Sequence, residues 1–565
     1  MFHHRVKTTL PFRWRTPLLL CLVFALTLPS PAQTWISTST QGLGTVLANA
    51  AQLGPLPAST TLHIAVALKL NNRDLLVQYV KTINDPGSPL YGSSLTVSQF
   101  VANYAPTSAQ VQSVVNYLVA QGFSNIQVEP NNLFVTADGT VAEIGAAFFT
   151  SIAQFQQDGR KVYANLTDAQ VPAPLGSTVA AVLGLNNTGR MAPPTHKQAP
   201  PSLSIPAVHF YTPQGYWTAY DVGGTATGSQ TPIAIFAEGD LTQVLKDLRV
   251  AESVNGLPQV PVQVVQVGLA SPDTAGQDEW DLDTQMSTGM AGKVAKLIIY
   301  DTTSLTDSDV ALMFNKFAHQ NIAKAGSASF GLCETFAFLD GSMLADDQVF
   351  LEAAAQGQTV FASTGDNGAA CPVVGATNGV PLSGAAGMVL YPASSPYVVA
   401  VGGTTLTTDA NYNYIAEVGW DAGGGGISAW EIAPVWQQAV LPTTAAGKAL
   451  PDVSMDADLV SGALVYIGCQ PGQDPRATCE FIVGGTSLSS PLWLGTWARL
   501  QSAHANRLGF ASPSLYRLYQ APPASYPGFH DIVGGCNGLF CAIPGFDYVT
   551  GLGTPDVAEL RSAVR

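Results

Sequence analysis

The sequence predicts an α/β protein, in which a doubly wound parallel sheet forms a large C-terminal domain and a small α+β open sandwich precedes it. The chain has 565 residues, 47% of them apolar, which is enough for a large core divided among two or more domains. After residue 208, short β-branched runs alternate with helical stretches and Gly-rich turns. A proline-rich stretch at 188–207 separates this part from a smaller alternation of strands and helices at 33–187.

The first 32 residues have the pattern of a secretory signal peptide. Four basic and no acidic side chains lie within residues 1–16, an apolar run extends from Leu18 to Leu28, and the small residues Ser30 and Ala32 follow. The apolar run is short for a bilayer span, and an N-terminal membrane anchor is the alternative. We expect a secreted or periplasmic protein without stable membrane insertion.

Residues 33–187 alternate strands with short helices. Residues 61–69 and the stretch 126–136 have the composition of strands. A threonine followed three residues later by Gln or Glu predicts a helix start, because each side chain caps the other's backbone N–H. These capping boxes are Thr107 with Gln110 and Thr140 with Glu143, and Asp158-Gly159 predicts a hairpin turn.

Residues 188–207 predict a stiff and exposed linker, a natural site for proteolytic nicking, because they contain five prolines and no apolar period. The domain that follows has near-continuous apolar runs, which are typical of parallel strands buried on both faces. Ligands of such sheets bind beyond the carboxyl ends of the strands. The expected strands are 232–236, 296–300, 359–362 and 397–401.

Six cysteines remain after the signal segment, an even number that favours disulfides in an exported chain. Six cysteines allow 15 connectivities in principle. The short spacings favour Cys469–Cys479 and Cys536–Cys541, which leaves Cys333–Cys371. No C-x-x-C pair or histidine cluster points to zinc.

The charge balance excludes some partners. The chain has 24 basic and 39 acidic side chains, a net charge of −15 and a pI near 4.8, so nothing in it favours binding to nucleic acid. Only 11% of the residues are charged. Such a surface gains little repulsion when its carboxylates are protonated, which favours tolerance of low pH.

Ser487 is the candidate nucleophile. Two glycines precede Thr486-Ser487, and a helix-like stretch follows, so the chain can turn sharply and place the serine at a helix N-terminus. Unpaired N–H groups there, including that of Ser487, can hold an oxyanion. The structural alternative is a loop that only caps a helix.

Glu279 and Asp283 form a candidate pair of acids, four residues apart and on one face if this segment is helical. Coupled carboxyl groups can serve a serine nucleophile when no imidazole is available. Acids solvated at a helix start are the structural alternative. A Ser-His-Asp site is the weaker hypothesis, because no histidine has the setting of an ordinary subtilase among the four that follow the linker, His209, His319, His504 and His530.

Two further loops contain candidate residues. Asp366 follows the expected strand 359–362 and, when protonated, could donate to a developing oxyanion, although Asp-Asn-Gly is also ordinary turn chemistry. Asp531 and Asp547 in a Gly-rich region are oxygen ligands of the kind that calcium takes. Read alone, they would be a loop.

Together these motifs resemble the sedolisin family, the kumamolisin-like serine-carboxyl peptidases. The joint order is specific: Glu-x-x-x-Asp, then Gly-Asp-x-Gly, Gly-Gly-Thr-Ser-x-x-x-Pro, Asp-Ile, and Gly-x-Asp before Thr-Gly-Leu-Gly. Further matches are Tyr211-Thr212-Pro213, Ser329-Phe330-Gly331, Ser394-Ser395-Pro396-Tyr397, Gly424-Gly425-Gly426-Ile427-Ser428 and Pro451-Asp452-Val453-Ser454, with Tyr91-Gly92, Leu95-Thr96 and Phe100 in the N-terminal part.

The resemblance implies a subtilisin-like fold, self-activation at low pH, and endopeptidase or tripeptidyl-peptidase activity. It assigns residues 1–32 to the signal, 33–187 to the activation propeptide, 188–207 to the processing linker and 208–565 to the catalytic domain. It implies Ser487 as nucleophile, Glu279 as its base, Asp283 as the partner of Glu279, and Asp366 as the oxyanion donor. The implied calcium ligands are the side chains of Asp531 and Asp547 and the carbonyls of Ile532, Ile543 and Gly545.

We therefore expect an exported acid peptidase, made as a zymogen, that acts on polypeptides and is inhibited by its own propeptide. We expect a monomer. The alternative is a catalytically inactive relative that acts as a secreted binding or structural protein. A covalent glycosidase with paired carboxylates is a third possibility, but it would leave the Gly-Thr-Ser motif without a role.

Overall fold

The structure is a computed structural model. It divides into Met1–Thr34 and Trp35–Arg565, and the second unit carries the fold. The expected signal segment lies outside the described residues. The structure describes residues 1, 33–44, 47, 50–157, 159–192, 196–198, 210–371, 388–438, 440–441, 446–519 and 527–565.

The N-terminal domain is an α+β open sandwich, as expected. Its four-stranded antiparallel sheet has the order β4-β5-β3-β9, and apolar residues of α3 and α4 complete a separate core on one face. Both capping boxes are confirmed, with Thr107 and Thr140 as N-caps. The elements are β1 Trp35–Ser37, β2 Ala51–Pro55, β3 Thr61–Leu68, α1 Arg73–Ile83, α2 Val97–Asn103, α3 Ser108–Ala120, β4 Ser124–Val128, β5 Phe134–Thr140, α4 Val141–Phe148, β6 Ile152–Gln157, β7 Arg160–Asn165, β8 Gln170–Pro172, η1 Ala173–Leu175 and β9 Val179–Leu183.

The stretch 126–136 is two strands rather than one. β4 and β5 pair antiparallel across a turn in which Asn132 has φ +63°, a conformation that asparagine tolerates better than most residues. The prediction missed this turn because Asn131-Asn132 carries no glycine or proline. The expected hairpin forms between β6 and β7, with Gln157 opposite Arg160, and Asp158 lies outside the described residues.

The C-terminal domain contains the predicted doubly wound sheet. Its order is β12-β13-β11-β14-β16-β18-β19, with β22 also paired to β18, and only the β18–β19 pair is antiparallel. The four expected strands are confirmed as β11, β13, β16 and β18. The expected linker contains a strand, β10 His196–Gln198, which pairs antiparallel with β24. The strands of the domain are β11 Pro232–Glu238, β12 Val262–Val267, β13 Lys296–Thr302, β14 Ala325–Ala328, β15 Leu332–Cys333, β16 Thr359–Ser363, β17 Leu390–Tyr391, β18 Val399–Thr408, β19 Tyr414–Gly419, β20 Gly426–Ile432, β21 Gly447–Leu450, β22 Val453–Asp456, β23 Ala463–Tyr466, β24 Glu480–Gly484, β25 Phe529–His530 and β26 Thr554–Pro555.

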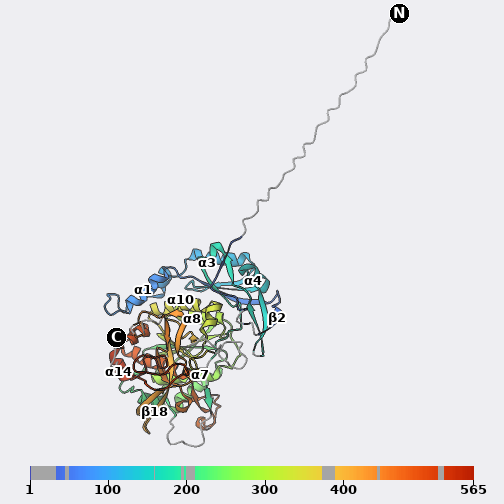
Figure 1. Cartoon of the computed structure of the whole chain (residues 1–565). Coiled ribbons are helices and arrows are strands. Elements are labelled where there is room, and N and C mark those ends of the chain that lie inside the picture. The colour runs from blue at the N-terminus through green and yellow to red at the C-terminus, as the bar shows by residue number, and fades with distance from the viewer. Residues whose placement is uncertain are drawn as a thin grey trace. The chain divides into compact units, whose positions relative to one another are not determined.

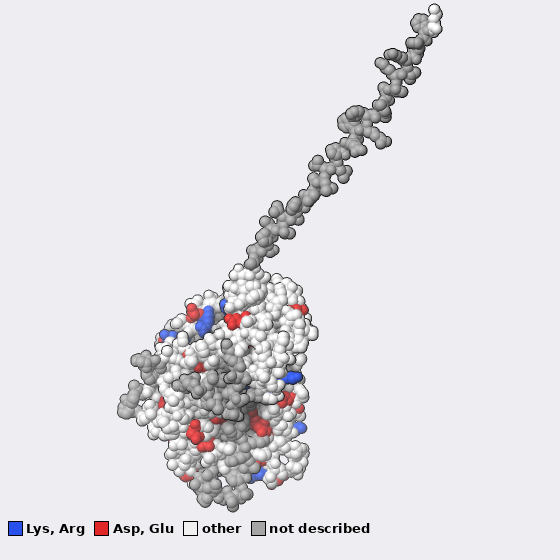
Figure 2. All heavy atoms as spheres, turned by 45° about the vertical axis from the view of Figure 1, so that its right-hand side comes forward, with Lys and Arg blue, Asp and Glu red and all other residues white. Residues whose placement is uncertain are grey.

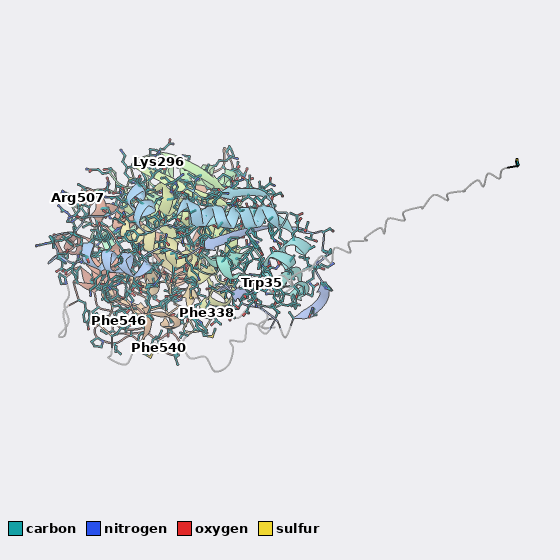
Figure 3. All side chains as sticks on the ribbon, turned by 90° about the horizontal axis from the view of Figure 1, so that it is seen from above. Trp35, Lys296, Phe338, Arg507, Phe540 and Phe546 are labelled. Atoms are coloured by element: carbon teal, nitrogen blue, oxygen red, sulfur yellow. A yellow bond between two sulfur atoms is a disulfide. The ribbon has the colours of Figure 1, made fainter. Side chains whose placement is uncertain are left out.

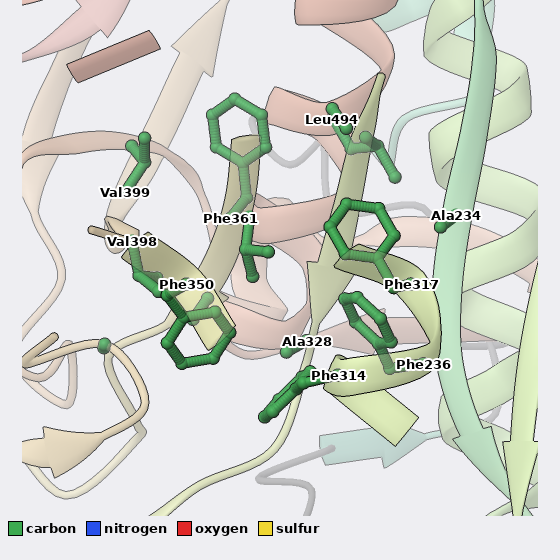
Figure 4. Packing of buried hydrophobic residues seen from close by; sticks show 14 of the residues in the cluster. Ala234, Phe236, Phe314, Phe317, Ala328, Phe350, Phe361, Val398, Val399 and Leu494 are labelled. Carbon is green, nitrogen blue, oxygen red and sulfur yellow. The ribbon is translucent and has the colours of Figure 1, made fainter. Parts of the chain in front are cut away.

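Helices cover the sheet and bury an aromatic core. Phe314 of α8 packs on Phe236 of β11 and on Phe350 of α10, with ring centroids 4.9 and 4.8 Å apart. Figure 4 shows these rings meeting beside the strands. Figure 1 shows α8 and α10 close together. The helices are α5 Pro213–Ala219, α6 Thr242–Val254, α7 Gln277–Ala291, α8 Asp307–Gln320, α9 Glu334–Asp340, α10 Ser342–Ala355, η2 Leu459–Ser461, α11 Pro475–Thr478, α12 Thr486–Ala503, α13 Ala511–Tyr516 and α14 Val557–Ala563.

Direct hydrogen bonds connect the N-terminal domain to helices of the C-terminal domain. The backbone N–H of Leu70 donates to Gln348 of α10 at 2.8 Å. Asn131 donates to Glu352 of the same helix at 2.7 Å, and the N–H of Gly184 donates to Asp307 of α8 at 3.1 Å. The N-terminal domain therefore supplies donors to a buried amide and two buried carboxyl groups of these helices.

Three disulfides form with the favoured pairing, Cys333–Cys371, Cys469–Cys479 and Cys536–Cys541. The coloured face in Figure 2 carries few blue or red side chains, in agreement with the low charge content. Across the described part of the chain, no helix combines the length and apolar character needed to cross a membrane.

Candidate active site

Glu279 and Asp283 lie one turn apart on α7, as predicted. The helix begins after Gly276, where a Cβ would lie 2.5 Å from the indole nitrogen of Trp280. That nitrogen donates to the carbonyl oxygen of Glu238 at 2.9 Å, which holds the first turn against the end of β11. Both carboxyl side chains are buried, with exposed fractions of 1% and 0%.

Ser487 is the second residue of α12, where the Gly-rich motif turns the chain from β24 into the helix. Gly485 has φ +115°, a conformation that glycine adopts without a Cβ penalty. A Cβ at Gly484 would lie 2.7 Å from the carbonyl oxygen of Ala457, so the approach also requires glycine. In the first turn, the N–H of Thr486 donates to Asp366 and that of Leu488 to the carbonyl oxygen of Gly485. The N–H of Ser487 can face an oxyanion.

The hydroxyl of Ser487 lies between Glu279 and Ser329. It donates to the carbonyl oxygen of Ser329 at 3.5 Å, and its closeness to Glu279 lowers the pKa of that carboxyl. Neither Glu279 oxygen has a hydrogen bond of good geometry to a described residue. Ser487 and Glu279 are therefore close enough to interact electrostatically, although no hydrogen bond of good geometry joins them.

Glu279 and Asp283 are electrostatically coupled. Burial raises the pKa of both carboxyls well above the usual range, and the charge of Asp283 raises the pKa of Glu279 further. A hydrogen bond from Ser329 acts in the opposite direction on Asp283. Like-charged carboxyls in one site share protons, so one member can accept a proton while the other stays neutral.

Asp366 lies directly beside the nucleophile turn. Its Oδ1 accepts from the backbone N–H of Thr486 at 2.8 Å and from the Thr486 hydroxyl at 2.8 Å. Burial raises the pKa of Asp366 to about 7, and the contacts with Thr486 lower it in part. The carboxyl is thus neutral in acid and able to donate a hydrogen bond.

Ser329 belongs to the site, although sequence reasoning gave it no role. Its hydroxyl donates to Asp283 Oδ1 at 2.6 Å and lies 3.5 Å from the carbonyl oxygen of Ser487. The available signal was position: Ser329 directly follows the buried strand β14, at the carboxyl end where ligands bind.

The described histidines lie in other environments. His504 contacts the carbonyl oxygen of Arg561 at 3.0 Å, and His530 stacks on Tyr414 with ring centroids 4.0 Å apart. Burial lowers the pKa of His319, and His209 lies outside the described residues. No described histidine contacts Ser487, so the subtilase alternative has no support in this part of the chain.

The start of the expected linker pairs with the backbone beside the candidate site. Ala192 and Gly331 form an antiparallel bridge, with Ala192 N–H to Gly331 oxygen at 3.2 Å and the reverse bond at 3.4 Å. On the other side, Met191 N–H donates to the Leu305 carbonyl oxygen at 2.9 Å. Gly331 follows Ser329 by two residues, so this segment pairs with the backbone that follows β14 and carries Ser329.

The expected calcium ligands converge on one turn. Both oxygens of Asp531 accept from the N–H of Gly545, at 3.1 and 3.0 Å, and Asp547 Oδ2 accepts from the N–H of Ile543 at 3.1 Å. The carbonyls of Ile532, Ile543 and Gly545 accept no hydrogen bond from a described residue. The neighbouring Phe540 and Phe546 locate this loop in Figure 3.

Carboxylate and carbonyl oxygens are the kind of donor that calcium takes, and both carboxylates here also accept from backbone N–H groups. This arrangement does not fit a metal that needs three acidic, histidine or cysteine ligands, since no such cluster exists among the described residues. Burial raises the pKa of Asp547 to about 6, which a bound cation would oppose.

Comparison with known proteins decides the family. Residues 48–188 match the model of the pro-kumamolisin activation domain. The chain is 39% identical to sedolisin of Pseudomonas sp. (strain 101) over 95% of its length and 93% of the relative. The chain belongs to the sedolisin family.

Other matches agree. Xanthomonalisin of Xanthomonas sp. (strain T-22) is 36% identical over 90% of this chain and 66% of that protein. The solved structure of Pseudomonas sedolisin with two molecules of pseudo-iodotyrostatin aligns with a TM-score of 0.57 and 38% identity, over 63% of this chain and 98% of that one. The protein is therefore a serine-carboxyl peptidase with an activation propeptide, which disfavours the glycosidase and the inactive relative.

Proposed function

We propose that this sedolisin-family peptidase is an exported, acid-acting enzyme, made as a zymogen, in which Ser487 is the nucleophile. Glu279 is the base that takes the hydroxyl proton, and Asp283 shares a proton with Glu279. Asp366, protonated in acid, and the N–H of Ser487 hold the oxyanion. The observation that carries this proposal is the burial of two coupled carboxyls beside a serine that no described histidine contacts.

The chemistry proceeds in two halves. Ser487 Oγ attacks the scissile carbonyl, its proton passes to Glu279, and the C–O bond to the enzyme forms as the carbonyl oxygen becomes the oxyanion. Collapse breaks the C–N bond, and Glu279 returns the proton to the leaving amine. Water then hydrolyses the acyl-enzyme with Glu279 again acting as base, which regenerates the serine.

The other segments of the chain also have proposed roles. Residues 1–32 direct export and are removed. Residues 33–187 are the propeptide and 188–207 the linker in which processing occurs, leaving a catalytic domain at 208–565 that we propose to be monomeric. Asp531, Ile532, Ile543, Gly545 and Asp547 bind calcium, whose charge holds the C-terminal loop together and supplies no chemical step.

Incubation of the purified proprotein at about pH 4, followed by mass spectrometry, tests this proposal. We expect wild-type protein to lose its propeptide and to cleave a peptide library, whose cleavage pattern also separates endopeptidase from tripeptidyl-peptidase action. Ser487→Ala should remain full length. Ser512→Ala is the matched control, because Ser512 is also buried and its hydroxyl has no described partner. Normal maturation of Ser487→Ala without added protease would refute self-processing.

A further inference from the structure

Arg190 lies two residues before Ala192, which pairs with Gly331, and it contacts acids of the catalytic domain. Its guanidinium donates to Glu238 Oε1 and, at 3.2 Å, to Asp273 Oδ2. Glu238 is the last residue of β11, and its side chain is 5% exposed, whereas that of Asp273 is 36% exposed. Two carboxylates on one guanidinium form a charge-assisted contact of the stronger kind.

The carboxyl groups near Arg190 have acceptor oxygens to which Arg190 does not donate. Glu238 Oε2 and Asp301 Oδ1 are buried and have no hydrogen-bond partner among the described residues. Asp301 lies on the neighbouring strand β13, beside Ala237 in the ladder. Burial and the charge of Glu238 raise the pKa of Asp301 to about 7. Buried carboxyls with unused oxygens remain costly unless a donor reaches them.

The linker segment shows how a substrate would lie here. An extended peptide that adds to the edge at Ser329–Gly331 makes the same main-chain bonds as Ala192. In that register, the substrate residue two positions after the Ala192 equivalent lies opposite Ser329, whose carbonyl oxygen is 3.5 Å from the Ser487 hydroxyl. This residue carries the attacked carbonyl, and the Arg190 equivalent is the fifth residue before the scissile bond.

We infer that Glu238 and Asp273, once the linker has left, form a cation-binding subsite that selects Lys or Arg as the fifth residue before the scissile bond. The inference rests on the proposed function, since it uses the same cleft. Arg190 is then a stand-in for substrate that keeps the subsite filled in the zymogen. The alternative role, a lock for the linker alone, predicts no effect on substrate choice.

Peptides that differ only at the fifth position test the subsite. With mature enzyme, kcat/KM for Arg should exceed that for Gln by about tenfold, and a peptide with Glu should be poorer still. The effect should appear mainly in KM, because this contact is equal in ground and transition states. Moving the arginine one residue in either direction should abolish the gain.

Variants assign the preference to the carboxyls. Glu238→Gln should bring the Arg-to-Gln ratio to within about twofold, and Asp273→Asn, at a more exposed position that tolerates change, should lower it as well. Glu252→Gln is the matched control and should retain the tenfold ratio, since Glu252, 3% exposed against 5% for Glu238, is likewise buried and paired to an arginine, Arg249, on α6. A ratio near one in wild type, or an unchanged ratio in both subsite variants, overturns the inference.

A binding measurement separates this inference from the proposed function. Ser487→Ala enzyme, processed in trans, should bind the Arg peptide about tenfold more tightly than the Gln peptide in fluorescence anisotropy. Binding with this preference but no turnover by wild type would support the subsite and contradict the peptidase mechanism. Turnover by wild type without this binding preference would support the peptidase mechanism and contradict the subsite.

Discussion

The hydroxyl of Ser329 donates a 2.6 Å hydrogen bond to Oδ1 of Asp283. The carbonyl oxygen of the same Ser329 accepts from the hydroxyl of Ser487, the proposed nucleophile, at 3.5 Å. Ser329 thus contacts both Asp283 and Ser487, and its hydroxyl stabilises the charged form of Asp283. Ser329 is a positioning residue, since it acts through Asp283 and Ser487.

Ser329→Ala should lower kcat by about 10- to 100-fold with little change in KM, as expected for loss of a hydrogen bond to a charged group. Because that bond lowers the pKa of Asp283, its loss should shift the acid limb of the rate profile to higher pH. Ser329→Thr keeps the hydroxyl and should restore much of the rate. A kcat and pH profile equal to wild type in the alanine variant would remove Ser329 from the mechanism.

Asp366→Asn tests the oxyanion donor. The pKa of Asp366 is raised to about 7, so its O–H is available below that pH and is lost as pH rises through it. We expect the wild-type rate to fall toward and above pH 7. The amide of the variant donates at every pH, so its kcat should no longer show this decline; the same decline in the variant would exclude Asp366 as its cause.

The apolar runs allowed the parallel sheet to be predicted, because strands buried on both faces leave a pattern that does not depend on distant residues. The Gly-rich turn at Ser487 and the i, i+4 spacing of Glu279 and Asp283 are local in the same way. Ser329 was missed because its role depends on α7 and α12, which the chain brings to it from 46 and 158 positions away.

The contacts of Arg190 with Glu238 and Asp273 also could not be predicted from the sequence. Glu238 and Asp273 are separated from Arg190 by 48 and 83 residues, and a lone arginine in a proline-rich linker has no periodicity to mark it. The prediction of a single strand at 126–136 failed for a different reason. An asparagine in the left-handed conformation takes the place of the glycine that usually signals such a turn.

Removal of calcium should destabilise the catalytic domain. A calcium chelator should lower the Tm of the mature enzyme by several degrees, as expected when a ligand that binds only the folded state is withdrawn. In Asp531→Asn and Asp547→Asn the Tm should be lower at the outset and should respond less to the chelator. Equal chelator shifts in wild type and both variants would place the calcium effect elsewhere.

The burial of Glu352 should make the zymogen less stable toward neutral pH. This carboxyl, which accepts from Asn131 of the N-terminal domain at 2.7 Å, has a pKa raised from 4.5 to about 8 by burial, whereas the hydrogen bond from Asn131 acts in the opposite direction. The contribution of Glu352 to the stability of the folded chain is fully present below about pH 4.5 and is lost as pH rises through about 8.

Thermal unfolding of the zymogen between pH 4 and 8, in the Ser487→Ala background that prevents processing, measures this effect. The Tm should fall as pH rises, and Glu352→Gln should remove part of this fall, because the amide does not ionise. Glu143→Gln, in a capping box that lowers the pKa of its carboxyl rather than raising it, should behave as its parent. An equal fall in Tm with and without Glu352 would contradict the assignment.

The rate of peptide hydrolysis by Glu279→Gln enzyme, processed in trans and measured from pH 3 to 8, tests the central claim most directly. Loss of the base should reduce kcat by about 10³-fold or more at every pH, comparable to Ser487→Ala, because the amide cannot accept the serine proton. A Glu279→Gln enzyme with the wild-type rate would show that Ser487 is activated by some other group.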